Sequence, residues 1–162
     1  MVNMREIFTY DRISSQGCER VPLTEGERSS YLLDEGDLLF ARQSLTFAGA
    51  GKCSIVHVVD EPTTWESHLI RVRLDRRIAE PRFYYHFFRS AQGRLRVASI
   101  VEQVAAAGIR GSDLRRLIVP VPPLHEQQAI AEVLGALDDK IAVNAKLGAV
   151  ATRTRTGTPV PP

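Results

Sequence analysis

The sequence predicts an α+β fold that ends in one long C-terminal helix, and three patterns lead to this prediction. Two short runs of mainly apolar residues, Leu38–Ala41 and Ile55–Val59, each follow a glycine turn, as buried strands often do. A helical pattern of aromatic residues follows Pro81. From Leu124 to about Val150 the chain has no proline and only two glycines, which is typical of a long helix.

The composition is ordinary for a globular chain, with 162 residues, 44% hydrophobic and 25% charged. This length allows one domain with a real core and one appended element. No apolar run approaches the roughly 20 residues of a membrane helix, and the first residues lack the layout of a signal peptide. Cys18 and Cys53 form neither a CxxC pair nor a disulfide framework. We therefore expect a cytoplasmic protein with no membrane contact.

Within the domain, residues 1–35 are polar and weakly patterned, and the periodic patterns come later. An alternation of apolar residues with two arginines predicts a strand with one buried face at Ile70, Arg71, Val72, Arg73 and Leu74. A helix is predicted to open at Pro81 and to end at Gly93. Its aromatic residues fall on one helix face, which favours core packing over base stacking for Phe83, Tyr84, Phe87 and Phe88.

The middle of the chain is rich in arginine. Between Arg71 and Arg116 every Lys or Arg position is an arginine, and these residues outnumber the acidic ones. Arginine can hold a phosphate or a guanine edge with two hydrogen bonds. A nucleic-acid surface is one interpretation and an ordinary solvated surface is the other, and the pattern alone favours neither.

The C-terminal helix carries an apolar seam. Ile130, Leu134, Leu137 and Ile141 follow alternating four- and three-residue steps, and Asn144 continues the same register. This heptad spacing favours packing against a second helix, with the amide fixing the register; the alternative is an amphipathic helix packed on its own domain. The Thr-Arg-rich ending, residues 151–162, is low in complexity and is predicted to be disordered.

No motif for catalysis, metal binding or nucleotide binding stands out. Gly51 and Lys52 resemble the end of a phosphate-binding loop, but the next residue is Cys53 instead of Ser or Thr. The four histidines lack metal-ligand spacing. We therefore expect no cofactor, no metal and no catalytic residue, so that the chain is not an enzyme.

Several segments of the sequence together resemble the DNA-specificity subunits of type I restriction–modification systems. The most specific is the junction that runs from IRGSDL at 109–114 through PVPPL at 120–124 into EQQAIAEVL at 126–134 and LDDKI at 137–141. GDLLFAR at 36–42 and ESHLIRV at 66–72 are similar to the interior of the same family's domain. The likeness extends over roughly residues 32–146.

The resemblance implies a mixed-sheet DNA target-recognition domain at residues 1–121, a spacer helix of coiled-coil type at 122–150 and the disordered tail at 151–162. Specificity subunits of this family carry two such domains, each recognising one half of a split site, and two long antiparallel helices hold the domains apart. A helix over 124–150 would span about 40 Å, which exceeds one DNA turn of about 34 Å. The chain departs from the family pattern in three ways. It has one domain instead of two, it has few opening strands, and its helix gives way to the Thr-Arg repeat. These departures suggest a half-subunit or a truncated product.

The implied function is sequence-specific binding of double-stranded DNA, with methylation and cleavage left to the methyltransferase and restriction subunits. A second copy or a second half-subunit would pair through the helix. The alternative is an interaction protein that does not bind DNA and docks on a methyltransferase subunit through its helix.

Candidate site residues follow from residue type and loop position. The candidates for DNA contact are Arg42, Gln43, Ser44, Lys52, Arg110, Ser112 and Arg115. The candidates for the helix interface are Ile130, Leu134, Leu137, Ile141 and Asn144.

Overall fold

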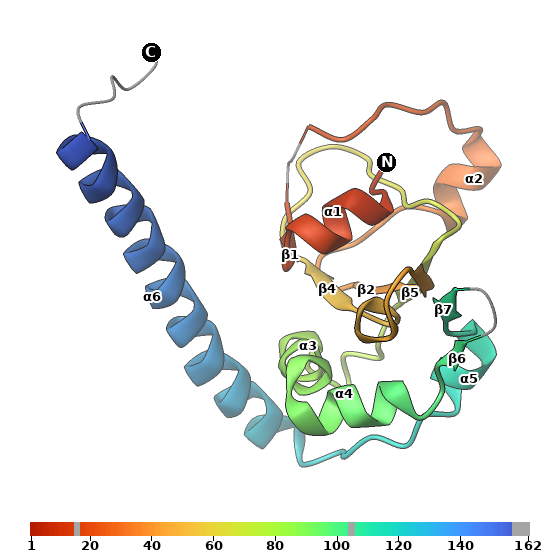
Figure 1. Ribbon diagram of the computed structural model, residues 1–162. Coiled ribbons are helices and arrows are strands. Elements are labelled where there is room, and N and C mark those ends of the chain that lie inside the picture. Colours follow the sequence, from red (N-terminus) through yellow and green to blue (C-terminus); the bar gives the residue numbers. More distant parts are fainter. Residues whose placement is uncertain (15–16, 104–105, 157–162) are drawn as a thin grey trace.

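The computed structural model describes residues 1–14, 17–103 and 106–156 and shows a mixed α/β domain from which one long helix departs (Figure 1). The main sheet has the strand order β1-β4-β2-β5. Its β1–β4 pair is parallel and its other pairs are antiparallel, so the predicted mixed sheet is confirmed. These strands are β1 (Arg12–Ile13), β2 (Leu38–Ala41), β4 (Cys53–Val56) and β5 (Leu69–Val72).

A second, smaller sheet has the order β3-β7-β6 and joins segments that lie far apart in the sequence. Its strands are β3 (Gln43–Ser44), β6 (Glu102–Gln103) and β7 (Ala107–Gly108). Helices surround both sheets: α1 (Met4–Thr9), α2 (Glu25–Ser30), the 3₁₀ turn η1 (Phe47–Gly49), α3 (Pro81–Arg89), α4 (Ala91–Ala98), α5 (Gly111–Arg115) and α6 (Leu124–Thr156).

The main sheet separates two hydrophobic cores. Leu38 and Phe40 belong to one core and Leu39 and Ala41 to the other, because alternate side chains of a strand point to opposite faces. Both faces are therefore covered, and every residue of β2 and β4 is buried. This explains why these strands appear in the sequence as unbroken apolar runs.

The aromatic cluster of α3 fills the first core, which confirms the core-packing interpretation. Phe83, Tyr84, Phe87 and Phe88 are all buried, and the ring of Phe88 meets that of Phe40 edge to face at 5.0 Å.

The predicted end of that helix at Gly93 is wrong. The helix breaks at Ser90, whose Oγ accepts a hydrogen bond from the Gly93 N–H at 3.1 Å and caps α4. A Cβ atom on Gly93 would lie 1.9 Å from the carbonyl oxygen of Phe87. Gly93 therefore marks a close approach of two helices, because no larger residue fits there.

The strand predicted at Ile55–Val59 is shifted by the turn before it. Gly51 adopts a φ of +65°, so the chain is already extended at Cys53, and β4 ends at Val56. His57, which lies within the predicted strand, is exposed and follows the end of β4. The weakly patterned residues 1–35 also contribute more structure than expected, since Val2, Ile7 and Ile13 are completely buried in the second core.

Helix α6 extends past the expected end near Val150 to Thr156. Residues 151–156 of the predicted disordered tail thus continue the helix, and no glycine or proline stands between Gly148 and Gly157 to stop it. The rest of the predicted tail, residues 157–162, lies outside the described residues. None of the helices in the described ranges combines the length and the apolar character that crossing a membrane requires.

Candidate nucleic-acid interface

The small sheet brings together candidate residues from both ends of the domain. Gln43 pairs with Gly108 in the β3–β7 ladder, and the Ile109 N–H donates to the carbonyl oxygen of Arg42 at 2.9 Å. As a result Arg42, Gln43 and Arg110 line one shallow surface depression, although more than sixty residues separate Arg110 from the other two in the chain. All three are exposed, and their guanidinium and amide groups suit phosphate oxygens and base edges.

A negative charge lies in the same depression. Arg110 forms an ion pair of 2.5 Å with Glu102 of β6, and both side chains are largely exposed. An exposed pair of this kind contributes little to stability, so Arg110 can exchange Glu102 for another anion at small cost.

The loop that follows β3 is held in a fixed shape. The Thr46 N–H donates to Ser44 Oγ at 3.1 Å, and Thr46 Oγ1 accepts from the Gly49 N–H at 3.2 Å. From α4, the Arg94 guanidinium donates to the carbonyl oxygens of Ala48, Ala50 and Gly51. Ser44 therefore shapes this loop with its hydroxyl.

Lys52 is turned toward the N-terminal helix. Its ammonium donates to the Phe8 carbonyl oxygen at 3.1 Å and lies 3.6 Å from Asp11. Burial would raise the pKa of Asp11, but the hydrogen bond from Arg89 and the charges of Arg89 and Lys52 hold that pKa below its usual range. Lys52 thus ties α1 to β4, apart from the group formed by Arg42, Gln43 and Arg110.

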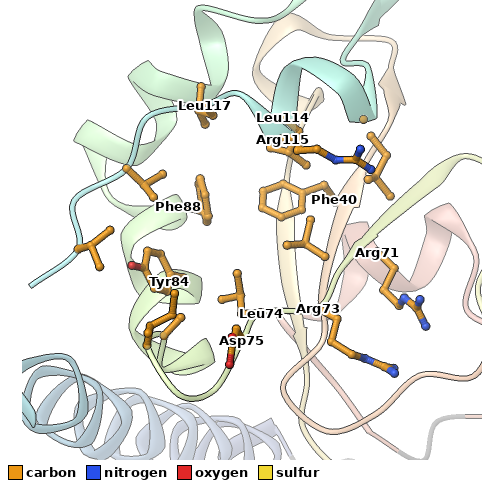
Figure 2. A pocket seen from close by; sticks show the side chains of 17 residues that line it. Phe40, Arg71, Arg73, Leu74, Asp75, Tyr84, Phe88, Leu114, Arg115 and Leu117 are labelled. Carbon is orange, nitrogen blue, oxygen red and sulfur yellow. The ribbon is translucent and has the colours of Figure 1, made fainter. Parts of the chain in front are cut away.

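Ser112 and Arg115 lie on α5, close to a second surface feature. Both are exposed, and Arg115 lies on the rim of an apolar cleft of about 530 Å³ (Figure 2). Phe40, Tyr84 and Phe88 are among its lining residues, and it lies between β5, α3 and the extended residues 117–121. The side chains of Arg71 and Arg73 border the cleft but point away from Tyr84 and Phe88 (Figure 2).

Most arginines of the arginine-rich segment already contact groups of the protein itself. Arg73 donates to the buried carboxylate of Asp37 at 2.8 and 2.7 Å, and Arg71 donates to the Leu32 carbonyl oxygen and stacks on Trp65. Others bind acids or carbonyl oxygens in the same way: Arg76, Arg77, Arg82, Arg89, Arg94 and Arg96. Most of these arginines are therefore engaged within the protein, although the exposed pairs of Arg77 and Arg82 with neighbouring acids contribute little to stability.

Arg115 and Arg116 are the exceptions, because neither side chain takes an ion-pair or hydrogen-bond partner among the described residues.

Sequence reasoning missed the roles of three residues near this surface. Leu45 is 98% exposed beside Gln43, in the loop that Arg94 holds. Residue type alone marks Leu45 as a core residue and gives no sign that Arg94 binds three carbonyl oxygens. Arg116 was noticed only as part of the arginine bias.

No group of three or more His, Cys, Asp or Glu side chains in the described ranges could hold a metal ion.

The side chains of the expected helix seam are largely exposed to solvent. Leu137 is 50% and Ile141 is 66% exposed, Ile130 is also exposed, and Asn144 lies on the surface. Leu134 is half-buried, since it borders the side of α6 that packs on the domain.

The chain was compared with known proteins. A family model described as "Type I restriction modification DNA specificity domain" matches residues 5–153. The specificity subunit of the type I restriction enzyme EcoKI from Escherichia coli (strain K12) is 31% identical over 109 residues, which cover 66% of this chain and 23% of that protein.

Two solved structures share the fold. The HsdS subunit from Thermoanaerobacter tengcongensis aligns with a TM-score of 0.55 and 24% identity, over 76% of this chain and 31% of that one. The S subunit of a type I restriction–modification system from M. genitalium aligns with a TM-score of 0.57 and 16% identity, over 91% and 36%. The chain spans about a quarter to a third of the length of these relatives. Because the family model covers most of the sequence, the chain belongs to the type I restriction–modification DNA-specificity family.

Proposed function

We propose that this chain carries a non-catalytic target-recognition domain of a specificity subunit, which recognises one half of a split target in double-stranded DNA. One observation carries the proposal. In a member of this family, the β3–β7 pairing brings Arg42, Gln43 and Arg110 together around one exposed surface depression. Such a group combines a phosphate-binding charge with an amide that can pair with an adenine edge.

The candidate residues divide by the contacts they already make. Gln43 would face the base edges, and Arg42 and Arg110 beside it would bind backbone phosphates, because the three side chains are exposed together. Ser112 and Arg115 would bind the DNA backbone from α5. Ser44 and Lys52 would act by holding their loops, since their polar atoms are bound within the protein.

Partner binding would use α6. The seam of Ile130, Leu134, Leu137, Ile141 and Asn144 would pack on a second long helix, from another copy or from a second half-subunit. The assembled pair would bind the methyltransferase and restriction subunits in the cytoplasm, and those subunits would supply methyl transfer and cleavage. Family membership favours this over an interaction protein that has lost DNA binding.

The test is selection of bound duplexes from a random pool with the purified chain. We expect one short sequence to be enriched, and expect Arg42→Ala with Arg110→Ala to abolish the enrichment. Arg20→Ala, at an exposed arginine paired with Glu61, is the control and should select the same sequence. A folded chain that enriches no sequence, yet binds a methyltransferase subunit, would support the interaction protein instead.

A second arm addresses catalysis. The chain alone should neither methylate nor cut the selected duplex, and both activities should appear only after the partner subunits are added. Methyl transfer or cleavage by the rigorously purified chain contradicts the proposal.

A further inference from the structure

The first turn of α6 contains a buried amide that joins three segments. Gln127 is 0% exposed, and its Oε1 accepts the Glu80 N–H at 2.9 Å. Its Nε2 donates to the carbonyl oxygens of Ile78 at 3.0 Å and Pro122 at 2.8 Å. Both amide hydrogens and the amide oxygen are therefore used, which fixes the start of the helix against the turn before α3 and against the proline segment.

A second polar attachment lies farther along the same helix. Arg12 of β1 donates to Asp139 at 2.6 Å and to Asp138 at 3.4 Å. Asp138 lies about three turns, or roughly 16 Å, beyond Gln127. Between the two attachments Ala131 is completely buried in the core that α3 fills. We call Gln127, Arg12, Asp138 and Asp139 the helix anchor.

Beyond the helix anchor α6 leaves the surface of the domain (Figure 1). Every residue from 140 to 148 is exposed, and the helix projects away from the domain (Figure 1). From Asp139 to Thr156 the helix is about 25 Å long, so a tilt of about 10° at the anchor would move its end by roughly 4 Å. That displacement is close to one base-pair step of DNA, about 3.4 Å.

We propose that the helix anchor fixes the angle at which α6 leaves the domain and thereby fixes the separation of the two DNA half-sites. This rests on the proposed function, because the separation matters only if two domains bind one duplex. Apolar contacts between a helix and a domain permit sliding, whereas hydrogen bonds to a buried amide allow one register. Gln127 and Arg12 are thus positioning residues and need not touch DNA.

The angle is measured by pulsed electron paramagnetic resonance on the full chain. Nitroxide labels on Gln92→Cys in α4 and Lys146→Cys in α6 report the distance across the anchor, since both positions are exposed. Cys18 is replaced by Ser, while Cys53 stays, because burial raises the pKa of its thiol and keeps it protonated and unreactive. Labelled chain is refolded with excess unlabelled chain, so that only distances within one chain are observed.

The anchor variants are Gln127→Glu, which loses both amide donors, and Arg12→Gln. Their matched controls are Gln128→Glu at the exposed neighbouring glutamine and Arg20→Gln at an exposed ion pair. We expect one narrow distance peak in the parent and both controls, and loss of that narrow peak in each anchor variant. Thermal unfolding monitored by near-UV circular dichroism checks that the domain remains folded.

A narrow, unshifted peak in folded Arg12→Gln and Gln127→Glu overturns the proposal. If Gln127→Glu unfolds the domain, Arg12→Gln decides the question alone, because the Arg12 side chain is only partly buried at the junction.

A DNA arm then separates this inference from the proposed function. The parent should bind duplexes with one spacer length between half-sites, and the anchor variants should also accept lengths that differ by one base pair. If the parent binds no DNA, the proposed function fails while the distance measurement still tests the helix anchor. If the variants keep the parent's spacer preference, the inference fails and the proposed function stands.

Discussion

The recognition domain and the projecting half of α6 differ in how far their apolar side chains are buried. In the domain, large apolar residues fill two cores and most arginines are paired with acids or carbonyl oxygens. In α6 beyond Asp139, Ile141, Val143 and Leu147 are all more than half exposed. The domain thus buries most of its large apolar side chains, whereas the helix end leaves its own exposed and gains little stability by itself.

The largest effect is expected from charges placed on the helix seam. Leu137→Glu with Ile141→Glu should abolish self-association, or association with a methyltransferase subunit, because burying two carboxylates in an apolar seam is strongly unfavourable. Sedimentation velocity measures this. Val143→Glu is the matched control, since Val143 is similarly exposed but lies off the seam, and this variant should associate as the parent does.

The contrast between a buried domain core and an exposed seam is contradicted if the parent sediments as a monomer and the double variant is unfolded throughout. The seam would then belong to the core of the domain, as in the alternative that the sequence left open.

A smaller effect is expected from the internal arginine contacts. Asp37 is buried and accepts two hydrogen bonds from Arg73, so Asp37→Asn should lower the free energy of unfolding by about 2 kcal/mol. Asp34→Asn, which removes an exposed partner of the same arginine, should cost less than about 1 kcal/mol. Urea unfolding measures the free energy of unfolding of both variants. Equal losses of this free energy would mean that burial does not distinguish the Arg73–Asp37 pair from the Arg73–Asp34 pair.

Substitutions of Gln43 and Arg110 in the surface depression should change the affinity for DNA and leave the stability of the fold unchanged. Gln43→Ala should weaken binding of the selected duplex by about 1 kcal/mol and relax its preference at one base. Arg110→Ala should weaken all duplexes alike and reduce the slope of the salt dependence by about 1. Fluorescence anisotropy measures both, with unchanged melting temperatures as the control. If Gln43→Ala alters neither affinity nor base preference, Gln43 does not contact a base.

The smallest effect concerns pH at the junction of α3 and α6. Burial lowers the pKa of His86 below its usual value, Asp138 opposes this shift, and Arg12, Arg89 and Arg82 add to it. Because the unfolded chain then binds the proton more readily than the folded chain, stability should fall as the pH drops through about 6.5, by less than about 1 kcal/mol. His86→Gln should reduce this loss and His125→Gln, at an exposed position, should not. Thermal unfolding from about pH 7.5 to about pH 5.5 measures the difference, and identical curves for His86→Gln and the parent would contradict it.

Local patterns predicted much of the fold. Strand β2 and the core role of the α3 aromatics were correct, since a periodic apolar pattern reports burial directly. The position of β4 was wrong by two residues at its start, because the left-handed turn at Gly51 fixed it.

The candidate site was only partly predictable, for a physical reason. β3 and β7 have two residues each, too few for a period, so their pairing and the approach of Arg110 to Arg42 came from tertiary structure. The sequence likewise could not distinguish arginines that bind carbonyl oxygens from those that face solvent. Gln127 was noticed only as part of a motif, because a polar residue in a helical pattern predicts exposure and this one is fully buried.

The most direct test of the central claim, that this domain recognises DNA, is a salt titration with the duplex selected by the chain and a scrambled duplex of equal length. The account predicts tighter binding of the selected duplex. It also predicts a linear fall of the logarithm of the association constant with the logarithm of salt, by orders of magnitude between about 50 and about 200 mM if several phosphates are contacted. A flat salt response, or equal affinity for the two duplexes at every salt concentration, would contradict the account.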